Sequence, residues 1–95
     1  MENNPDPHNR IHWEPSVDDK FNQLIAKIPV FLRSIAQGKL LQRIESNLKK
    51  ENRGAVSEKD LVDVFFAETP FGFHGPMKTD MQELGIDYTK YGYSK

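Results

Sequence analysis

The sequence predicts a single all-α domain, built as a small bundle of three main helices plus a short fourth helix and an aromatic C-terminal tail. Three observations support this fold class. The length of 95 residues suits one domain. Apolar residues recur at helical spacing in successive segments, and proline or glycine separates these segments. The apolar fraction of 37% predicts a thin core, to which six phenylalanines and three tyrosines contribute large side chains.

The chain divides into three parts. We expect a disordered N-terminal lead over residues 1–12, a single helical domain over residues 13–85, and a tyrosine-containing tail over residues 86–95. The lead is polar, and Pro5 and Pro7 disfavour regular structure within it.

The first helix is predicted to begin at Ser16 and to end at Ile28. Ser16 is a good N-cap residue, and with Asp19 three positions later it resembles a capping box. Pro29 disfavours helical geometry at the preceding residue, which ends the helix. The apolar stripe of this helix consists of Val17, Phe21, Leu24, Ile25 and Ile28.

The second helix is expected from about Pro29 to Asn52. Gly38 in its middle costs about 1 kcal/mol against alanine, so a kink or a split into two helices remains open. Its predicted buried stripe consists of Val30, Phe31, Ile35, Leu41, Ile44 and Leu48, widened by Leu32 and Leu40.

The third helix is predicted to start at Ser57, which caps it, and to end at Thr69-Pro70. Val56 packs against Leu61 in this interpretation, as a hydrophobic staple. The buried face consists of Leu61, Val64 and Phe65.

A short fourth helix is expected from Pro76 to a terminating Gly85. Its apolar face consists of Met77, Met81 and Leu84.

Composition and charge exclude several classes of function. With 13 basic and 14 acidic residues, the chain lacks the cationic excess that drives non-specific binding to nucleic acids or membranes. The absence of cysteine excludes disulfides, thiolate metal sites and cysteine nucleophiles. No apolar run approaches the roughly 20 residues that span a bilayer, and the first residues lack the pattern of a signal peptide. We therefore expect a cytoplasmic protein without a membrane partner.

The order of the features between residues 13 and 67 resembles a known family. Trp13 is followed by Pro29-Val30-Phe31-Leu32-Arg33, by the Ile44-Glu45 pair and by Val56-Ser57 at a helix start. This order resembles the small helical domain at the C-terminus of the B subunit of light-independent protochlorophyllide reductase. The resemblance implies a helical fold and an accessory function. It implies no reductase activity, because the cluster-binding cysteines and the substrate cavity of that enzyme lie outside this domain.

No catalytic or metal-binding arrangement is predicted. The three histidines, His8, His12 and His74, do not form a pair with a carboxylate at a plausible metal spacing. Capping and the helix dipole explain the carboxylates near helix starts, and the scattered glycines form no phosphate loop. We expect no enzyme activity and no cofactor.

The strongest interaction signal is the segment from Phe65 to Tyr93, which is rich in aromatic residues and methionine, the types enriched at binding hot spots. Two interpretations stay open. The segment closes the core as a lid that uses Phe71 and Met77 and leaves the tyrosines exposed, or it binds a partner. The candidate binding residues are Trp13, Arg33, Phe66, Phe71, Phe73, His74, Tyr88, Tyr91 and Tyr93.

Three functional hypotheses follow. The first is a protein-interaction or accessory module that docks on a redox or tetrapyrrole-pathway enzyme. The second is a binder of a flat apolar ligand such as a tetrapyrrole, held between Trp13, the aromatic turn and Arg33; the favoured alternative for Arg33 is a structural bond with Glu45 or a helix C-terminus. The third, DNA binding through the second helix, is disfavoured because acidic residues dilute its basic side chains. Those basic side chains are Lys39, Arg43, Lys49, Lys50 and Arg53.

Overall fold

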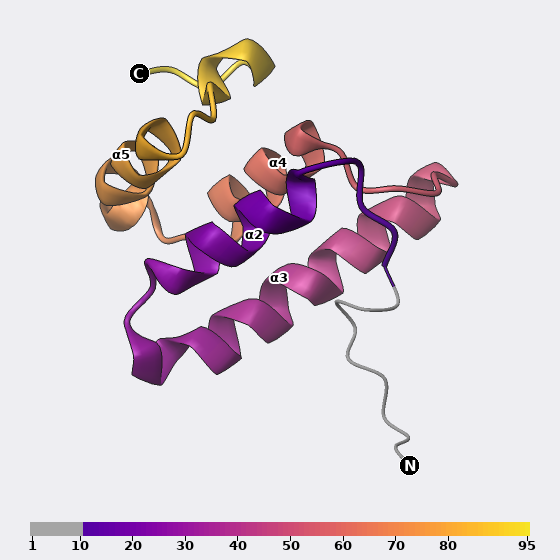
Figure 1. The fold of residues 1–95 in the computed structure, drawn as a ribbon, viewed down its shortest axis with the longest axis horizontal. Coiled ribbons are helices and arrows are strands. Elements are labelled where there is room, and N and C mark those ends of the chain that lie inside the picture. Colours follow the sequence, from indigo (N-terminus) through magenta and orange to yellow (C-terminus); the bar gives the residue numbers. More distant parts are fainter. Residues whose placement is uncertain (1–10) are drawn as a thin grey trace.

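The computed structural model describes residues 11–95, which form an all-α fold and confirm the predicted class (Figure 1). The helices are α2 (Val17–Ala26), α3 (Val30–Glu51), α4 (Glu58–Glu68) and α5 (His74–Glu83), and the 3-10 turns are η1 (Phe71–Phe73) and η2 (Tyr88–Tyr91). Residues 1–10, which hold most of the expected lead together with Pro5, Pro7 and His8, lie outside the described residues.

Helices α2 and α3 run antiparallel, and α4 packs across both of them (Figure 1). The core between them takes its largest fully buried side chains from every helix and from the C-terminal segment. These side chains are Phe21, Ile44, Val56, Leu61, Val62, Val64, Met81, Ile86 and Tyr88.

The packed domain begins two residues earlier than expected. Ile11 is buried, and the carbonyl of His12 accepts a hydrogen bond of 2.9 Å from the Val56 amide. The Glu14 amide donates to the Val56 carbonyl at 2.9 Å, so Trp13 and Val56 form a parallel bridge. This bridge fixes the chain before α2 to the loop before α4.

The predicted capping box at Ser16 is wrong. Ser16 has a φ of +66° and its side chain makes no capping hydrogen bond. The chain must turn sharply between the bridge at Trp13 and the first turn of α2, and the bond from the Val17 amide to the Glu14 carbonyl closes that turn. Its geometry places Ser16 in the left-handed region.

Helix α3 is one uninterrupted helix of 22 residues, so Gly38 does not split it. Its buried residues are Leu40, Leu41, Ile44 and Leu48, all in the C-terminal half. The prediction that Val30, Phe31 and Ile35 are buried is wrong, since they are 72%, 79% and 62% exposed.

The lengths of the helices explain that exposure. At 1.5 Å per residue, α3 is about 33 Å long and α4 only about 16 Å. Because α4 turns back along α3 after a short loop, it covers the C-terminal half of α3 and leaves the N-terminal half uncovered.

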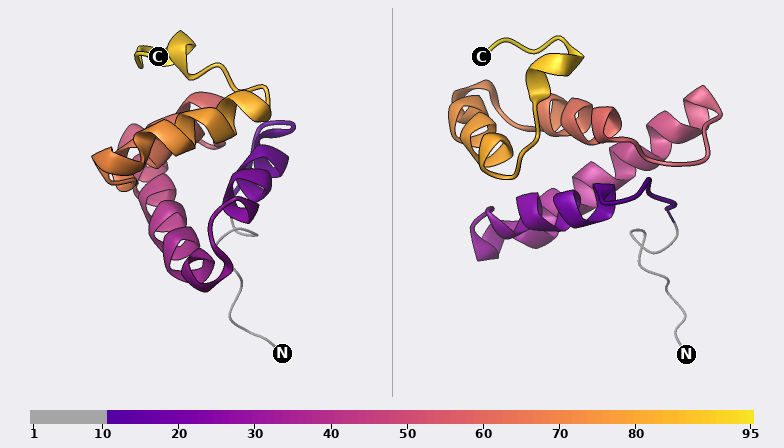
Figure 2. Two further views of the ribbon diagram at one scale, coloured as in Figure 1. Left: turned by 90° about the vertical axis from the view of Figure 1, so that its left-hand side faces the viewer. Right: turned by 45° about the horizontal axis from the view of Figure 1, so that its top comes forward.

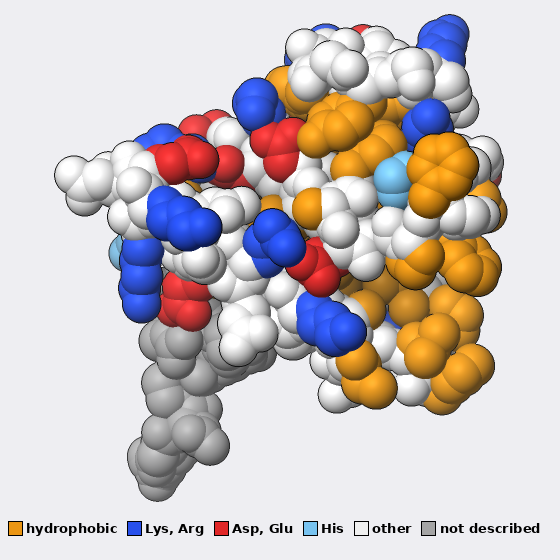
Figure 3. Space-filling model, turned by 180° about the vertical axis from the view of Figure 1, so that it is seen from behind, with side chains coloured by type: hydrophobic (Ala, Val, Ile, Leu, Met, Phe, Trp, Pro, Cys, Tyr) orange, Lys and Arg blue, Asp and Glu red, His pale blue; other side chains and the backbone are white. Residues whose placement is uncertain are grey.

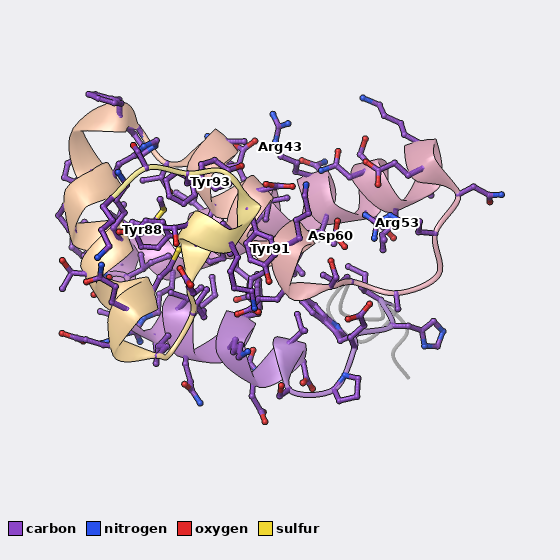
Figure 4. All side chains as sticks on the ribbon, turned by 90° about the horizontal axis from the view of Figure 1, so that it is seen from above. Arg43, Arg53, Asp60, Tyr88, Tyr91 and Tyr93 are labelled. Carbon is purple, nitrogen blue, oxygen red and sulfur yellow. The ribbon has the colours of Figure 1, made fainter. Side chains whose placement is uncertain are left out.

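Helix α4 begins with a complete capping box. The Ser57 hydroxyl accepts from the Asp60 amide, and the Asp60 carboxylate accepts from the Ser57 amide at 2.8 Å. Arg53 donates to the same carboxylate, at 2.8 Å through Nη1, and Figure 4 shows the two side chains lying together. Burial alone would raise the pKa of Asp60, but the hydrogen bonds from Arg53 and Ser57 outweigh it and lower that pKa.

Helix α5 begins at His74, two residues before the predicted Pro76, because η1 leads directly into it. Gly85 ends it as predicted, with a φ of +76°. The Ile86 amide donates to the Met81 carbonyl and the Gly85 amide to the Gln82 carbonyl, the pattern of a Schellman cap.

Candidate functional site

An apolar groove opens at the end of the molecule where α2 meets α3. Helices α2, α3 and α5, whose arrangement Figure 2 shows, all contribute residues to it, and its volume is about 450 Å³. The side chains that line it are mostly apolar and come from all four helices and the two turns between them. They include Leu24, Ile28, Pro29, Leu32, Ala36, Leu40, Phe65, Pro70, Phe73, Pro76 and Met77.

A ridge of exposed apolar side chains borders this groove on α3. Phe31 and Ile35, one helical turn apart, form the ridge. Leu32, one position from Phe31, lines the groove and is 44% exposed, and Phe73 lines the opposite wall and is 65% exposed. Figure 3 shows apolar side chains gathered on this half of the molecule, whereas charged side chains cover the other half. We call the groove, the ridge, Val30 and Phe73 the apolar face.

The charges around the groove are segregated. Lys27 and Lys39 lie on the side of α2 and α3, and Glu68 and Asp80 on the side of α4 and α5. Lys27 Nζ donates a hydrogen bond to Glu83 Oε1 of α5 at 2.7 Å, and this bond raises the pKa of Lys27. The apolar face therefore has a basic margin on one side and an acidic margin on the other.

Arg33 closes the turn between α2 and α3. Its Nε donates to the Ile28 carbonyl at 2.8 Å and its Nη2 to the Ala26 carbonyl at 2.7 Å. The Ala26 carbonyl is one of those that a helix C-terminus leaves without intrahelical partners, and Ile28 lies two residues beyond the end of α2. Arg33 thus makes a structural bond with a helix C-terminus, one of the two structural alternatives that the sequence left open.

Trp13 lies at the other end of α2 from Arg33. Its ring packs on Phe21 with 5.1 Å between centroids, and it is partly buried against the core. Because α2 is about 15 Å long and separates the two residues, Trp13 and Arg33 do not enclose a common ligand. The ligand site predicted between Trp13, the aromatic turn and Arg33 is not assembled.

Four predicted site residues form one internal aromatic cluster. Phe66 stacks on Tyr93 with 4.0 Å between centroids and an interplanar angle of 12°. His74 and Tyr88 contact the same ring, at 5.1 Å and 5.8 Å. His74 Nε2 also lies 2.9 Å from the Thr69 carbonyl, so it carries the proton. This cluster attaches the C-terminal segment to α4 and α5.

The expectation that the tyrosines are exposed and that Phe71 covers the core is wrong. Tyr88 is buried and accepts a hydrogen bond of 3.1 Å from Gln82, whereas Phe71 is 87% exposed. The lid interpretation holds for Met77, which is buried. Figure 4 shows the three tyrosines beside the C-terminal ribbon to which they belong.

Two tyrosine hydroxyls anchor the C-terminal segment to carboxylates of α4. Tyr91 donates to Glu58 at 2.8 Å and Tyr93 to Asp63 at 2.5 Å. Partial burial and these bonds to carboxylates raise the pKa of each tyrosine to about 12. Both side chains therefore serve the fold, and residues 86–95 pack on the helical domain.

Sequence reasoning missed the exposure of the first half of α3, although helical phase could have revealed it. At 100° per residue, Phe31 and Ile35 lie roughly 110–150° away from the direction of Leu41, Ile44 and Leu48. No single helix face can bury both sets.

The basic side chains of α3 and of the residues just after it are partly neutralised. Arg43 pairs with Glu68, and Arg53 pairs with Asp60 and Glu51. Among residues 11–95, no group of three or more His, Asp and Glu side chains is placed to hold a metal ion. Within the same residues, no helix combines the length and the apolar character that crossing a membrane requires.

Comparisons of the chain with known protein families, with curated proteins and with solved structures found no match.

Proposed function

We propose that this chain is a non-catalytic protein-interaction module that binds its partner through the apolar face. The supporting observation is the exposure of Phe31, Ile35 and Phe73 beside a groove lined by further apolar side chains. Phe31 and Phe73 alone expose roughly 200–350 Å², taking about 150–250 Å² for a whole aromatic side chain. Together with the aliphatic neighbours, this reaches the few hundred Å² at which an apolar patch marks an interaction site.

The interaction surface in this proposal differs from the predicted one. Of the predicted candidates, Phe73 lies on the apolar face and Phe71 is the exposed residue two positions before it, while the tyrosines, Phe66 and His74 make internal contacts. The resemblance to the protochlorophyllide reductase domain stays a prediction. It would place the partner among redox or tetrapyrrole-pathway enzymes.

Photo-crosslinking in the native host tests this proposal. A benzoylphenylalanine at Ile35 should give defined adducts with protein, because that position lies on the apolar face. The same probe at Lys50, an exposed position on the other half of α3, is the matched control and should give none. A Phe31→Ser change should abolish the adducts from position 35. Equal adducts from both positions, or none from position 35, would reject the proposal, and mass spectrometry of a defined adduct identifies the partner.

A second candidate function is binding of a small apolar ligand in the groove. The volume of about 450 Å³ lies within the range of roughly 300–1,000 Å³ typical of small-molecule sites. Saturable methyl shifts of Met77 in an NMR titration with apolar compounds would support it. Trp13 fluorescence is the wrong probe, because Trp13 does not line the groove.

A further inference from the structure

We infer that the partner on the apolar face is a second copy of this chain, in a two-fold symmetric dimer. This inference rests on the proposed function, because it assigns an occupant to the same face. It would make the chain a self-associating module in which α3 of one copy lies against α3 of the other.

The apolar face has a shape that can complement itself. A two-fold dimer requires a surface that complements itself, so that a projection and a recess of matching chemistry lie on the same face. The ridge of Phe31 and Ile35 and the groove lined by Leu32, Ala36 and Leu40 are adjacent stripes of one helix. Rotation about an axis between the stripes places the ridge of each copy in the groove of the other.

The apolar face is also large enough for a dimer interface. The exposed first half of α3, from Val30 to Gly38, is about 13 Å long and carries both ridge side chains. The groove that would receive these two side chains has a volume of about 450 Å³. A second copy that covers the ridge, Val30, Phe73 and the groove walls would bury an area close to that of a standard specific interface, which is about 800 Å² per partner.

Two opposite charges at the groove margin can also pair between copies. Lys39 lies on the α3 side of the groove and Asp80 on the α5 side. Within residues 11–95 neither forms an ion pair, although Asp80 contributes to the raised pKa of Lys27. When the ridge of a second copy enters the groove, its α3 brings Lys39 toward Asp80 of the first copy, and symmetry repeats the pair. Such opposed charges favour one register of association.

The same features disfavour a membrane surface as the occupant. The groove is concave, and its margin carries Glu68 and Asp80 as well as Lys27 and Lys39, so it presents no basic face to anionic headgroups. An interfacial membrane helix instead carries a basic face opposite a convex apolar one.

Sedimentation equilibrium of the full chain between 1 and 500 µM tests the inference. We expect the mean mass to rise from 11.0 kDa toward twice that value with concentration. Phe31→Ser together with Ile35→Ser should weaken self-association at least tenfold, and Lys50→Ser should leave it unchanged. Circular dichroism and the thermal midpoint at 1 µM check that each variant is folded.

A charge exchange provides the sharper test. Lys39→Glu and Asp80→Lys should each weaken the homodimer about tenfold, because each variant opposes like charges across the interface. Mixed together, the two variants should form a heterodimer as tight as the parent dimer, since every pair then joins opposite charges. Failure of the mixture to associate, with both variants folded, overturns the proposed geometry.

The outcomes separate this inference from the proposed function. A mass of 11.0 kDa at all concentrations overturns the dimer, while a crosslink from position 35 to a different protein leaves the interaction module standing. Phe31-dependent sedimentation of the monomer with lipid vesicles would overturn both, in favour of a membrane surface. A dimer that is insensitive to the ridge and charge variants overturns the assignment of the face.

Discussion

Replacing two phenylalanines by alanine, one in each of the first two helices, gives the most direct test of this structure. Phe21 in α2 is fully buried and packs against Trp13 and Phe65, with centroid distances of 5.1 Å and 6.1 Å. Phe31 in α3 is 79% exposed. Phe21→Ala should lower the free energy of unfolding by about 3–5 kcal/mol, since it removes a buried ring and leaves a cavity. Phe31→Ala should change it by no more than about 0.5 kcal/mol.

Urea denaturation followed by circular dichroism measures both effects at 1 µM, the lowest concentration of the sedimentation series. The loss expected for Phe21→Ala is close to the lower end of the total free energy of unfolding of a small domain, about 5–15 kcal/mol, so Phe21→Leu is included as a milder variant. It should still cost more than Phe31→Ala. A loss of 2 kcal/mol or more for Phe31→Ala would contradict the exposed position of the first half of α3, on which both proposals depend.

Three further predictions concern electrostatics and backbone conformation. Hydrogen bonds lower the pKa of Asp60, so the ionised Asp60 side chain stabilises the fold above about pH 4, and this stabilisation is lost as pH falls through its folded pKa. Asp60→Asn should lower the free energy of unfolding by about 1–2 kcal/mol at pH 7 and flatten the acid limb of a stability–pH curve. Because the pKa values of Tyr91 and Tyr93 are raised to about 12, these protonated side chains stabilise the fold fully below about pH 10, and the stabilisation is lost between pH 10 and 12. The double Tyr→Phe variant should lose less stability than the parent protein over that interval. A loss equal to that of the parent would contradict the anchoring role. Gly38→Ala, in open space within α3, should raise the free energy of unfolding by about 0.5–1 kcal/mol and so raise the thermal midpoint, whereas Gly85→Ala, at a φ of +76°, should lower that free energy by about 1–2 kcal/mol and lower the midpoint.

Local sequence signals predicted the ends of the helices well where the cause was local. Ser57 begins α4, Gly85 ends α5, and both act through hydrogen bonds within a few residues of themselves. Ser16 is the exception, because the bridge between Trp13 and Val56, forty-three positions apart, determines the backbone there.

The apolar stripe of α3 could be predicted as a helix but not as a buried surface. The periodic apolar residues correctly indicated helix from about residue 29 to residue 52; they left a kink or a split at Gly38 open, and the structure has one uninterrupted helix there. Helical phase alone separates Phe31 and Ile35 from the buried residues, but Val30 shares the direction of Leu48, and its exposure depends on how far α4 extends along α3, which is a property of packing between helices. Phe31 and Ile35 were assigned to the core, although they form the ridge of the candidate site.

The aromatic C-terminal segment shows the opposite error. Its tyrosines and Phe66 have the composition of a binding surface, and composition alone cannot tell whether aromatic rings face a partner or one another. The stacking of Tyr93 on Phe66 and the bond of Tyr91 to Glu58 join positions about thirty residues apart, and only the folded chain brings them together.

The sequence by itself determined the all-α class, the number of main helices and most of their ends, because spacing, capping residues and helix-terminating glycine and proline act over a few residues. The tertiary structure decided which apolar side chains are buried and which form the groove and the ridge. The physical reason is that burial depends on the lengths and crossing of neighbouring helices. A candidate binding face is what remains uncovered once those helices have packed.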